Sequence, residues 1–274
     1  MARQISLNFV QKGDGTPLVL VPGWSQTSRF FQKQIDGLSD SYRVIAPDMR
    51  GHGESPKPKH GYRIATLARD LREFLQEHGL TEVVLAGHSM GASIIWSYLE
   101  QFGAERIAKL IFIDQASLLT NGGELSGDKL LQAGAVFTPE TLYATASNVL
   151  TNQRAAVRAF KSAFFSNSIS EEDVILYTEQ SLKMPAQYAA KLLIEHGAQD
   201  WRDVIQYVIP KLSVPTLVVA GELATIVPPA AACWIAAQIP SAKLSIFSAA
   251  ELGSHFMFWE NASKFNAVLR DFIG

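Results

Sequence analysis

Residues 83–91 read Val-Val-Leu-Ala-Gly-His-Ser-Met-Gly, and residues 92–99 continue as Ala-Ser-Ile-Ile-Trp-Ser-Tyr-Leu. The apolar run at the start predicts a buried strand, and the second stretch predicts a helix. The Gly-x-Ser-x-Gly pattern between them is typical of a nucleophile elbow, a tight turn that holds a serine hydroxyl at its tip. Side chains at Gly87 and Gly91 would push the strand and the helix apart, which explains the two glycines. The pattern selects Ser89 as the candidate nucleophile.

A base for this serine must be found among the six histidines of the chain. A serine hydroxyl is a weak nucleophile until an imidazole takes its proton, and a carboxylate must orient that imidazole. We predict His255 as the base because it follows the last strand-like run, residues 244–247, after a loop that contains glycine. The alternative for His255 is a hydrogen-bonded core residue. His196 is typical of a last helical turn, and His88 should point away from the serine hydroxyl.

Two carboxylates are candidates for the acid that orients the imidazole. Asp114 follows the apolar run at 110–113, and Glu222 follows the apolar run at 216–220. The carboxyl ends of neighbouring parallel strands meet in one crevice, where catalytic side chains gather. We favour Asp114 because it can reach the imidazole from beside the nucleophile. The readings without catalysis are a helix cap at Asp114 and a solvated loop residue at Glu222.

An oxyanion hole must hold the charge that builds on the substrate oxygen during attack, and fixed backbone N–H groups serve this purpose. One donor should be the amide of Met90, the residue after the nucleophile. The second should come from the loop after the apolar run at 18–21, where residues 21–26 read Val-Pro-Gly-Trp-Ser-Gln. We predict the amide of Trp24 as this donor, while the absence of a side chain at Gly23 lets the backbone turn closely enough to aim it.

These motifs resemble the α/β-hydrolase superfamily, and the resemblance spans nearly the whole chain. Several motifs in the right order are more specific than one. The matching pieces are Val-Pro-Gly-Trp (21–24), Ala-Pro-Asp-Met-Arg-Gly-His-Gly-Glu-Ser (46–55), Gly-His-Ser-Met-Gly (87–91), Ile-Asp-Gln (113–115), Val-Pro-Thr-Leu-Val-Val-Ala-Gly (214–221) and Gly-Ser-His-Phe (253–256). The resemblance implies that Asp48, Arg50 and His52 belong to a structural turn rather than to the chemistry.

One position departs from the commoner pattern of the superfamily, in which an aspartate follows the strand at 216–220. That position holds Ala224 here. An acid at Asp114 resembles a minority branch with esterase-like and amide-hydrolysing members, and with cofactor-independent heterocycle dioxygenases. Those dioxygenases carry His directly after the serine, whereas this chain has Met90, which favours hydrolysis. Epoxide hydrolases and dehalogenases of the superfamily use Asp where this chain has Ser89.

Short apolar runs alternate with helical patterns along the chain, which predicts an α/β fold with a mostly parallel central sheet covered by helices on both faces. Residues 118–204 lack strand-like runs and read as helices. We therefore predict an α/β-hydrolase core domain of residues 1–117 and 205–274, with residues 118–204 inserted as a helical cap over the site. The strand-like runs are at 17–21, 43–46, 83–86, 110–113 and 216–220.

The composition is that of a compact enzyme. With 274 residues and a net charge of -2, the chain is long enough for one α/β domain with an insertion and has no excess of basic residues for nucleic acid. No apolar stretch approaches the ~20 residues that cross a membrane, and the N-terminus lacks the apolar core of a signal peptide. The single cysteine, Cys233, fits a reducing compartment, and we expect it to be buried in a helix. These features favour a cytoplasmic location.

The residue pattern indicates no cofactor. No spacing of His, Cys, Asp or Glu suggests a metal site, and no glycine-rich phosphate loop is present. The predicted partner is a small-molecule substrate, without nucleic acid or membrane, and the sequence defines no oligomeric state. The cap is rich in apolar and aromatic side chains that either line a pocket or fix the cap to the core. They are Val136, Phe137, Leu142, Tyr143, Phe160, Phe164, Phe165, Tyr177 and Met184.

The predicted function is hydrolysis of a carboxylic ester or lactone through an acyl-enzyme on Ser89. No cluster of Arg or Lys marks a carboxylate clamp, so a neutral and fairly apolar acyl group is favoured over a charged one. Cleavage of a thioester, an amide or a carbon–carbon bond is compatible with the same residues. The alternatives are a cofactor-independent dioxygenase acting on a heteroaromatic substrate, and a weakly catalytic ligand receptor on the same fold.

Overall fold

A central sheet of seven strands organises the computed structural model, which describes residues 5–240 and 242–274. The strand order is β1-β3-β2-β4-β5-β6-β7. β1 runs antiparallel to β3, and every other pairing is parallel, as the sequence predicts. The strands are β1 (Phe9–Lys12), β2 (Thr16–Val21), β3 (Tyr42–Pro47), β4 (Val83–His88), β5 (Ile107–Ile113), β6 (Thr216–Gly221) and β7 (Ala242–Phe247).

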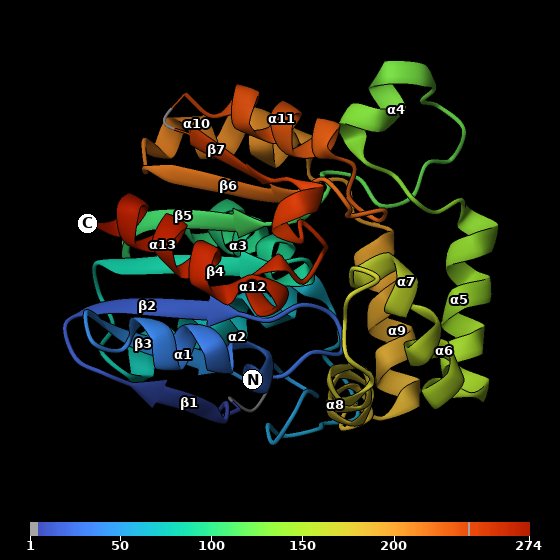
Figure 1. The fold of residues 1–274 in the computed structure, drawn as a ribbon, viewed down its shortest axis with the longest axis horizontal. Coiled ribbons are helices and arrows are strands. Elements are labelled where there is room, and N and C mark those ends of the chain that lie inside the picture. The colour runs from blue at the N-terminus through green and yellow to red at the C-terminus, as the bar shows by residue number, and fades with distance from the viewer. Residues whose placement is uncertain (1–4, 241) are drawn as a thin grey trace.

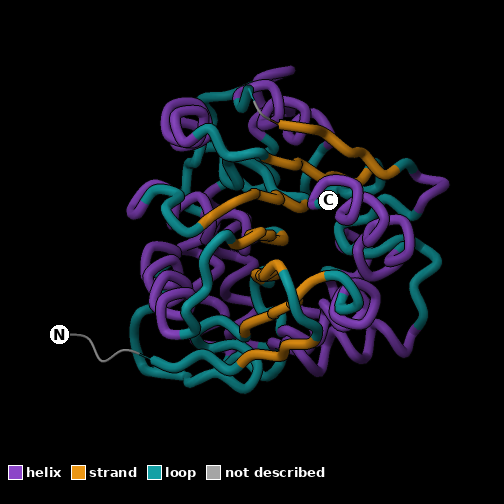
Figure 2. The backbone as a smooth tube through the Cα atoms, turned by 90° about the vertical axis from the view of Figure 1, so that its left-hand side faces the viewer, coloured by secondary structure: helices purple, strands orange, loops and turns teal. Residues whose placement is uncertain are grey.

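Helices cover both faces of the sheet, and Figure 2 shows the strands nearly end-on between them. Alternate residues of each central strand point to opposite faces: Val19 and Leu85 join one apolar cluster, and Leu18 and Val84 join the other. Both faces are buried, which explains why these strands read as continuous apolar runs. The first cluster includes α2 (Ile64–Glu77), α3 (Met90–Phe102) and α11 (Pro229–Gln238), and the second includes α1 (Gln32–Leu38), α12 (Met257–Glu260) and α13 (Ala262–Ile273).

The chain between β5 and β6 is largely helical and adds no strand to the sheet. In Figure 1 most of it lies beside the carboxyl ends of the strands, to the right of the arrowheads. The division at residues 118 and 204 into a core and a cap stays a prediction. The helices are α4 (Gly127–Ala133), α5 (Pro139–Thr151), α6 (Gln153–Ala159), α7 (Lys161–Phe164), α8 (Glu171–Ser181), α9 (Ala186–Gly197), the π-helix η2 (Val204–Val208) and α10 (Ile209–Leu212).

One expectation about the core is wrong. Cys233 lies in a helix, α11, as predicted, but its side chain is exposed rather than buried. The sequence of α11, Pro-Ala-Ala-Ala-Cys-Trp-Ile-Ala-Ala-Gln, places small apolar residues on every side of the helix. The pattern therefore does not indicate which face packs on the sheet. Among the described residues, no helix is both long and apolar enough to cross a lipid bilayer.

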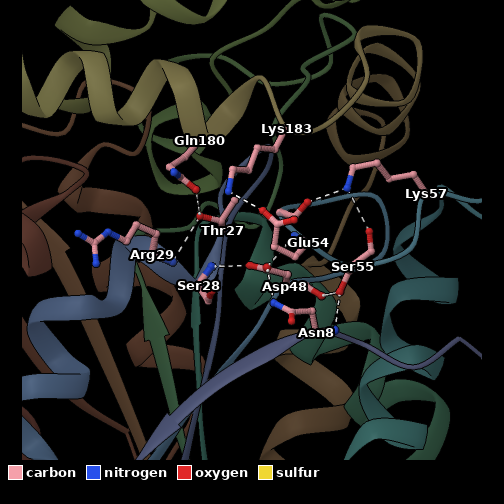
Figure 3. A network of polar contacts seen from close by, with 11 residues as sticks. Asn8, Thr27, Ser28, Arg29, Asp48, Glu54, Ser55, Lys57, Gln180 and Lys183 are labelled. Atoms are coloured by element: carbon pink, nitrogen blue, oxygen red, sulfur yellow. Dashed lines mark hydrogen bonds and ion pairs between the residues drawn. The ribbon is translucent and has the colours of Figure 1, made fainter.

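The turn after β3 holds the loop after β2 in place, and the loop after β2 carries Trp24, which borders the candidate site. Asp48 accepts hydrogen bonds from the backbone N–H of Ser28 (2.7 Å) and of Glu54 (3.0 Å). Figure 3 shows this network continuing through Glu54 to Lys183, which follows α8. His52 Nε2 accepts from the Ser25 N–H at 3.1 Å, and its Nδ1 lies 2.9 Å from the Arg50 carbonyl oxygen. These contacts join the turn after β3 to the loop after β2.

Candidate active site

Ser89 occupies a strained position at the junction of β4 and α3. Its backbone has φ 52° and ψ -125°, a conformation that residues with a side chain rarely adopt and that costs about 1–3 kcal/mol. A Cβ at Gly91 would lie 2.2 Å from the Val21 carbonyl oxygen, and one at Gly87 would lie 2.5 Å from the Gly91 carbonyl carbon. Only glycine fits at these two positions, so the strand and helix approach closely and hold the serine in its sharp turn.

His255 and Asp114 form a fully buried pair. His255 Nδ1 lies 2.5 Å from Asp114 Oδ2, and both side chains have 0% exposure. The backbone N–H of Gly221 donates to Asp114 Oδ1 at 3.1 Å, so each carboxylate oxygen has a partner. Asp114 itself has φ 48°, and its N–H donates to the Val219 carbonyl oxygen of β6. The end of the neighbouring strand thus fixes the acid.

Burial sets the protonation of this pair. It lowers the pKa of His255 from 6.5 to about 3, and it raises the pKa of Asp114 well above 3.8, an effect that the Gly221 hydrogen bond opposes. The imidazole is therefore neutral at neutral pH. With Nδ1 donating to the carboxylate, the lone pair lies on Nε2, which is buried and has no hydrogen-bond partner in the described part of the chain. An imidazole in this state can accept a proton.

Several contacts bring the His255 loop to the elbow. The rings of His255 and His88 lie 4.4 Å apart, and His88 Nε2 is 2.9 Å from the His255 carbonyl oxygen. Phe164 of α7 packs its ring 5.0 Å from the His255 ring, and it lines the same pocket as Ser89. No hydrogen bond joins Ser89 Oγ to His255 Nε2 among the described residues. Catalytic hydrogen bonds often shorten only when substrate binds.

The predicted oxyanion loop lies directly against the serine. A Cβ at Gly23 would be 3.1 Å from Ser89 Cβ, and the Gly23 N–H donates to Gln26 Oε1 at 3.1 Å. Among the described residues, the backbone N–H groups of Trp24 and Met90 donate no hydrogen bond to the protein. Both amides are therefore available to a substrate oxygen. The Trp24 indole donates to the Ala189 carbonyl oxygen at 2.9 Å, which joins this loop to α9.

Glu222, the other candidate acid, lies apart from the imidazole of His255. Its side chain is exposed, and its Oε2 accepts from the Ala249 N–H at 2.7 Å. Ala224, at the position where the sequence resemblance leads us to expect an aspartate, is buried. The geometry therefore pairs His255 with Asp114 and not with Glu222.

An apolar pocket opens at Ser89. Of the apolar residues noted in residues 118–204, four line this pocket, whereas Leu142 and Met184 are buried in the core cluster and Tyr143 is exposed. The segment therefore supplies both pocket walls and packing. The lining residues are Trp24, Ser89, Gln115, Leu119, Val136, Phe137, Phe160, Phe164, Leu193, His196, Ile226 and Val227.

Two polar residues of this pocket were not predicted from the sequence. His196 lies in the last turn of α9, as expected, but it also lines the pocket. Gln115 follows Asp114 and lines it too. Gln115 comes one residue after the candidate acid, and this position could have predicted a place near the site. Nothing in the sequence around His196 indicates which surroundings its ring faces. Among the described residues, no group of three or more His, Cys, Asp or Glu side chains could hold a metal ion.

Comparison with known proteins agrees with this architecture. A putative non-heme chloroperoxidase of Synechocystis sp. is 27% identical, over 98% of this chain and 95% of that protein. A bromoperoxidase from Bacillus anthracis superposes with a TM-score of 0.88 at 26% identity, covering 98% of this chain and 95% of the other. An esterase from Exiguobacterium antarcticum superposes with a TM-score of 0.87 at 27% identity, covering 98% and 96%.

The family model described as "alpha/beta hydrolase fold" matches residues 16–262. That range includes all strands of the sheet except β1, and it includes Ser89, Asp114 and His255. The chain therefore belongs to the α/β-hydrolase fold family.

Proposed function

We propose that the protein is a serine hydrolase that cleaves a carboxylic ester or lactone with a neutral, fairly apolar acyl group. The observation that carries this proposal is the buried His255 imidazole, held at Nδ1 by Asp114 and unpartnered at Nε2, which packs on His88, the residue before the strained Ser89. An esterase among the structural neighbours supports hydrolysis as the reaction type.

The reaction begins when Ser89 Oγ attacks the carbonyl carbon and transfers its proton to His255 Nε2. The carbonyl oxygen becomes negatively charged and accepts hydrogen bonds from the backbone N–H groups of Trp24 and Met90. Asp114 stabilises the imidazolium that forms and keeps the ring oriented. The tetrahedral intermediate then expels the alcohol, which takes the proton from His255, and an acyl group remains on Ser89.

Water completes the cycle. His255, neutral again, takes a proton from a water molecule, which attacks the acyl carbonyl carbon, and the same N–H groups hold the oxyanion. The acid product leaves, and the proton returns to Ser89. Most of the pocket wall is apolar, and no Lys, Arg, Asp or Glu lines the pocket in the described part of the chain, which favours a neutral acyl group.

The test is fluorophosphonate labelling combined with turnover of p-nitrophenyl esters of increasing acyl length. We expect wild-type protein to be labelled at Ser89 and to release p-nitrophenol, and the Ser89→Ala variant to do neither. Labelling elsewhere, or equal turnover by both proteins, would refute the proposal. A panel of lactones then separates the two substrate types.

A second candidate function is haloperoxidase activity, because two of the relatives described above are named as haloperoxidases. Halide-dependent consumption of hydrogen peroxide, measured beside ester turnover, tests it. Oxygen uptake with heteroaromatic substrates tests the dioxygenase alternative in the same way.

A further inference from the structure

The pocket at Ser89 carries two neutral polar side chains that the proposed reaction does not use. Among the described residues, four that line the pocket have hydrogen-bonding side chains: Ser89, Trp24, Gln115 and His196. The Trp24 indole N–H already donates to the Ala189 carbonyl oxygen. The remaining walls are aliphatic and aromatic. Polar groups in such a setting usually orient a ligand.

His196 is buried without a hydrogen-bond partner. Its side chain is on the cap-side helix α9, the residue is 5% exposed, and its Nδ1 is fully buried. Its Nδ1 has no hydrogen-bond partner among the residues that the structure describes. Burying a polar group without a partner is unfavourable, and such groups are rare in native proteins. Nine buried side-chain atoms of the described residues lack a partner, and His196 is the one residue among them that lines the pocket at Ser89, which points to a ligand as its partner.

Gln115 presents an unused acceptor in the same pocket. Its Nε2 donates to Ser93 Oγ of α3 at 2.9 Å, which fixes the direction of the amide. Its Oε1, on the other branch of the amide, accepts no hydrogen bond from the described residues. Gln115 is 5% exposed and lines the pocket, so its oxygen can accept a hydrogen bond from a ligand there.

The ligand group can be narrowed by charge and by hydrogen-bonding capacity. Burial lowers the pKa of His196 to about 3, so its ring is neutral at neutral pH and has one N–H donor and one acceptor nitrogen. Neither His196 nor Gln115 can neutralise a carboxylate or a phosphate. A hydroxyl fits both residues, because it donates to Gln115 Oε1 or to the acceptor nitrogen and accepts from the imidazole N–H.

We propose that His196 and Gln115 form a subsite for a neutral hydroxyl group of the acyl chain, so that the preferred substrates are hydroxylated esters or lactones. This inference rests on the proposed hydrolysis at Ser89 and names its substrate class. The apolar walls hold the carbon chain, and the two polar side chains select the hydroxyl.

The kinetic test compares methyl butanoate with its monohydroxylated isomers, followed by release of acid. For wild-type protein we expect kcat/KM to be about tenfold or more higher for at least one hydroxylated isomer, mainly through KM, because leaving buried polar groups unpaired penalises the plain ester. In the His196→Leu variant the ratio between the two esters should fall to about one. His196→Gln, which retains a hydrogen-bonding group, should keep part of the preference.

Leu193→Met is the matched control. Leu193 lies on α9 one turn before His196 and lines the same pocket, but it offers no hydrogen bond. The substitution changes the pocket wall while nearly conserving volume, so it should leave the ratio between the esters unchanged. Equal kcat/KM of wild-type protein for all isomers, or the same ratio in wild-type and His196→Leu protein, would overturn the inference while leaving the proposed hydrolysis intact.

A binding measurement separates this inference from the proposed hydrolysis. In Ser89→Ala protein with ¹⁵N-labelled histidine, adding the preferred hydroxylated ester should shift the His196 ring signals, assigned by their loss in Ser89→Ala/His196→Leu protein. Methyl butanoate should shift them less. Unmoved His196 signals at saturating ester, or no binding of either ester, would count against the subsite even if hydrolysis failed.

The thermal stability of His196→Leu is a further readout. Because no hydrogen bond to the described residues is lost, we expect its Tm to equal or exceed that of wild type. A clear fall in Tm would show that the imidazole serves the fold, and would count against a role in binding.

Discussion

The backbone N–H of Ser89 donates a 2.9 Å hydrogen bond to the carbonyl oxygen of Ile113, the residue before Asp114. The candidate nucleophile and the candidate acid therefore sit at the tips of adjacent strands, with their backbones joined by the last rung between β4 and β5. This geometry lets a carboxylate after β5 reach His255 in a chain that has alanine at position 224 after β6. The carboxylate approaches His255 from the strand beside the serine, and β6 holds Asp114 through the Gly221 N–H and the Val219 carbonyl oxygen.

Substitutions at Ser89 should distinguish the role of its hydroxyl in catalysis from the cost of its strained backbone. We expect Ser89→Ala to lose ester turnover and keep the fold, because alanine retains the strained backbone but has no nucleophile. Ser89→Gly should also be inactive, but more stable than Ser89→Ala by about 1 kcal/mol, since glycine adopts φ 52° without penalty. Urea denaturation of both variants measures this difference. Equal stabilities would show that the turn stores no strain.

The two candidate acids should differ sharply in their effect on kcat. Asp114→Asn should lower kcat by up to about 10⁴, because the amide no longer stabilises the imidazolium of His255. Glu222→Gln should change kcat little, since the exposed Glu222 bonds only the Ala249 N–H. Steady-state kinetics with one p-nitrophenyl ester measures both. The reverse order of effects would assign the acid to Glu222.

A substitution at Gly23 tests whether the loop after β2 supplies an oxyanion donor. In Gly23→Ala the new methyl group would lie 2.8 Å from Gln26 Nε2 and 3.1 Å from Ser89 Cβ, so the loop must shift. Displacing one oxyanion donor should lower kcat by about 10²-fold. Gly122→Ala is the control, because a methyl group there meets only Glu124 Oε2 at 3.2 Å on an exposed loop. A kcat for Gly23→Ala close to that of the control would exclude this loop from the chemistry.

Acid should destabilise the fold through its buried histidines. Burial lowers the pKa of His196 and of His255 to about 3 and that of His52 to about 4, whereas in the unfolded chain a histidine titrates near 6.5. Between these values the unfolded state binds more protons. The stabilisation is therefore complete above about pH 6.5 and is lost as pH falls toward the folded-state values.

The slope of the free energy of unfolding against pH tests this expectation. His196→Leu removes one such group, so the free energy of unfolding should fall less steeply between about pH 4 and pH 6, by about 1.4 kcal/mol per pH unit. Denaturant unfolding at several pH values compares the two proteins. Identical slopes would mean that His196 is not held neutral by burial.

The central strands and the elbow could be predicted because their signals are local. The buried strands read as apolar runs, and β2, β3, β4, β5 and β6 lie where those runs predict them. The pairing of His255 with Asp114 crosses 141 residues, yet it could be anticipated because the carboxyl ends of parallel strands must meet at one edge.

Features that depend on how a helix turns could not be predicted. The sequence does not indicate that Cys233 lies on the exposed side of α11, because small apolar residues occur all around this helix. The pattern of α9 predicts a helix, but whether His196 faces solvent, core or pocket depends on how α9 packs against α5 and the loop of Trp24. These packing choices rest on contacts between distant segments, which leave no periodic signal.

The central claim is that Ser89 carries the acyl group during turnover. The most direct measurement is rapid quenching with p-nitrophenyl butanoate, followed by intact-protein and peptide mass spectrometry. The account predicts that wild-type protein gains one butanoyl group on the peptide that contains Ser89, and that Ser89→Ala protein gains none. A butanoyl group on another residue, or ester turnover by the wild type that continues unchanged in Ser89→Ala protein, would contradict it.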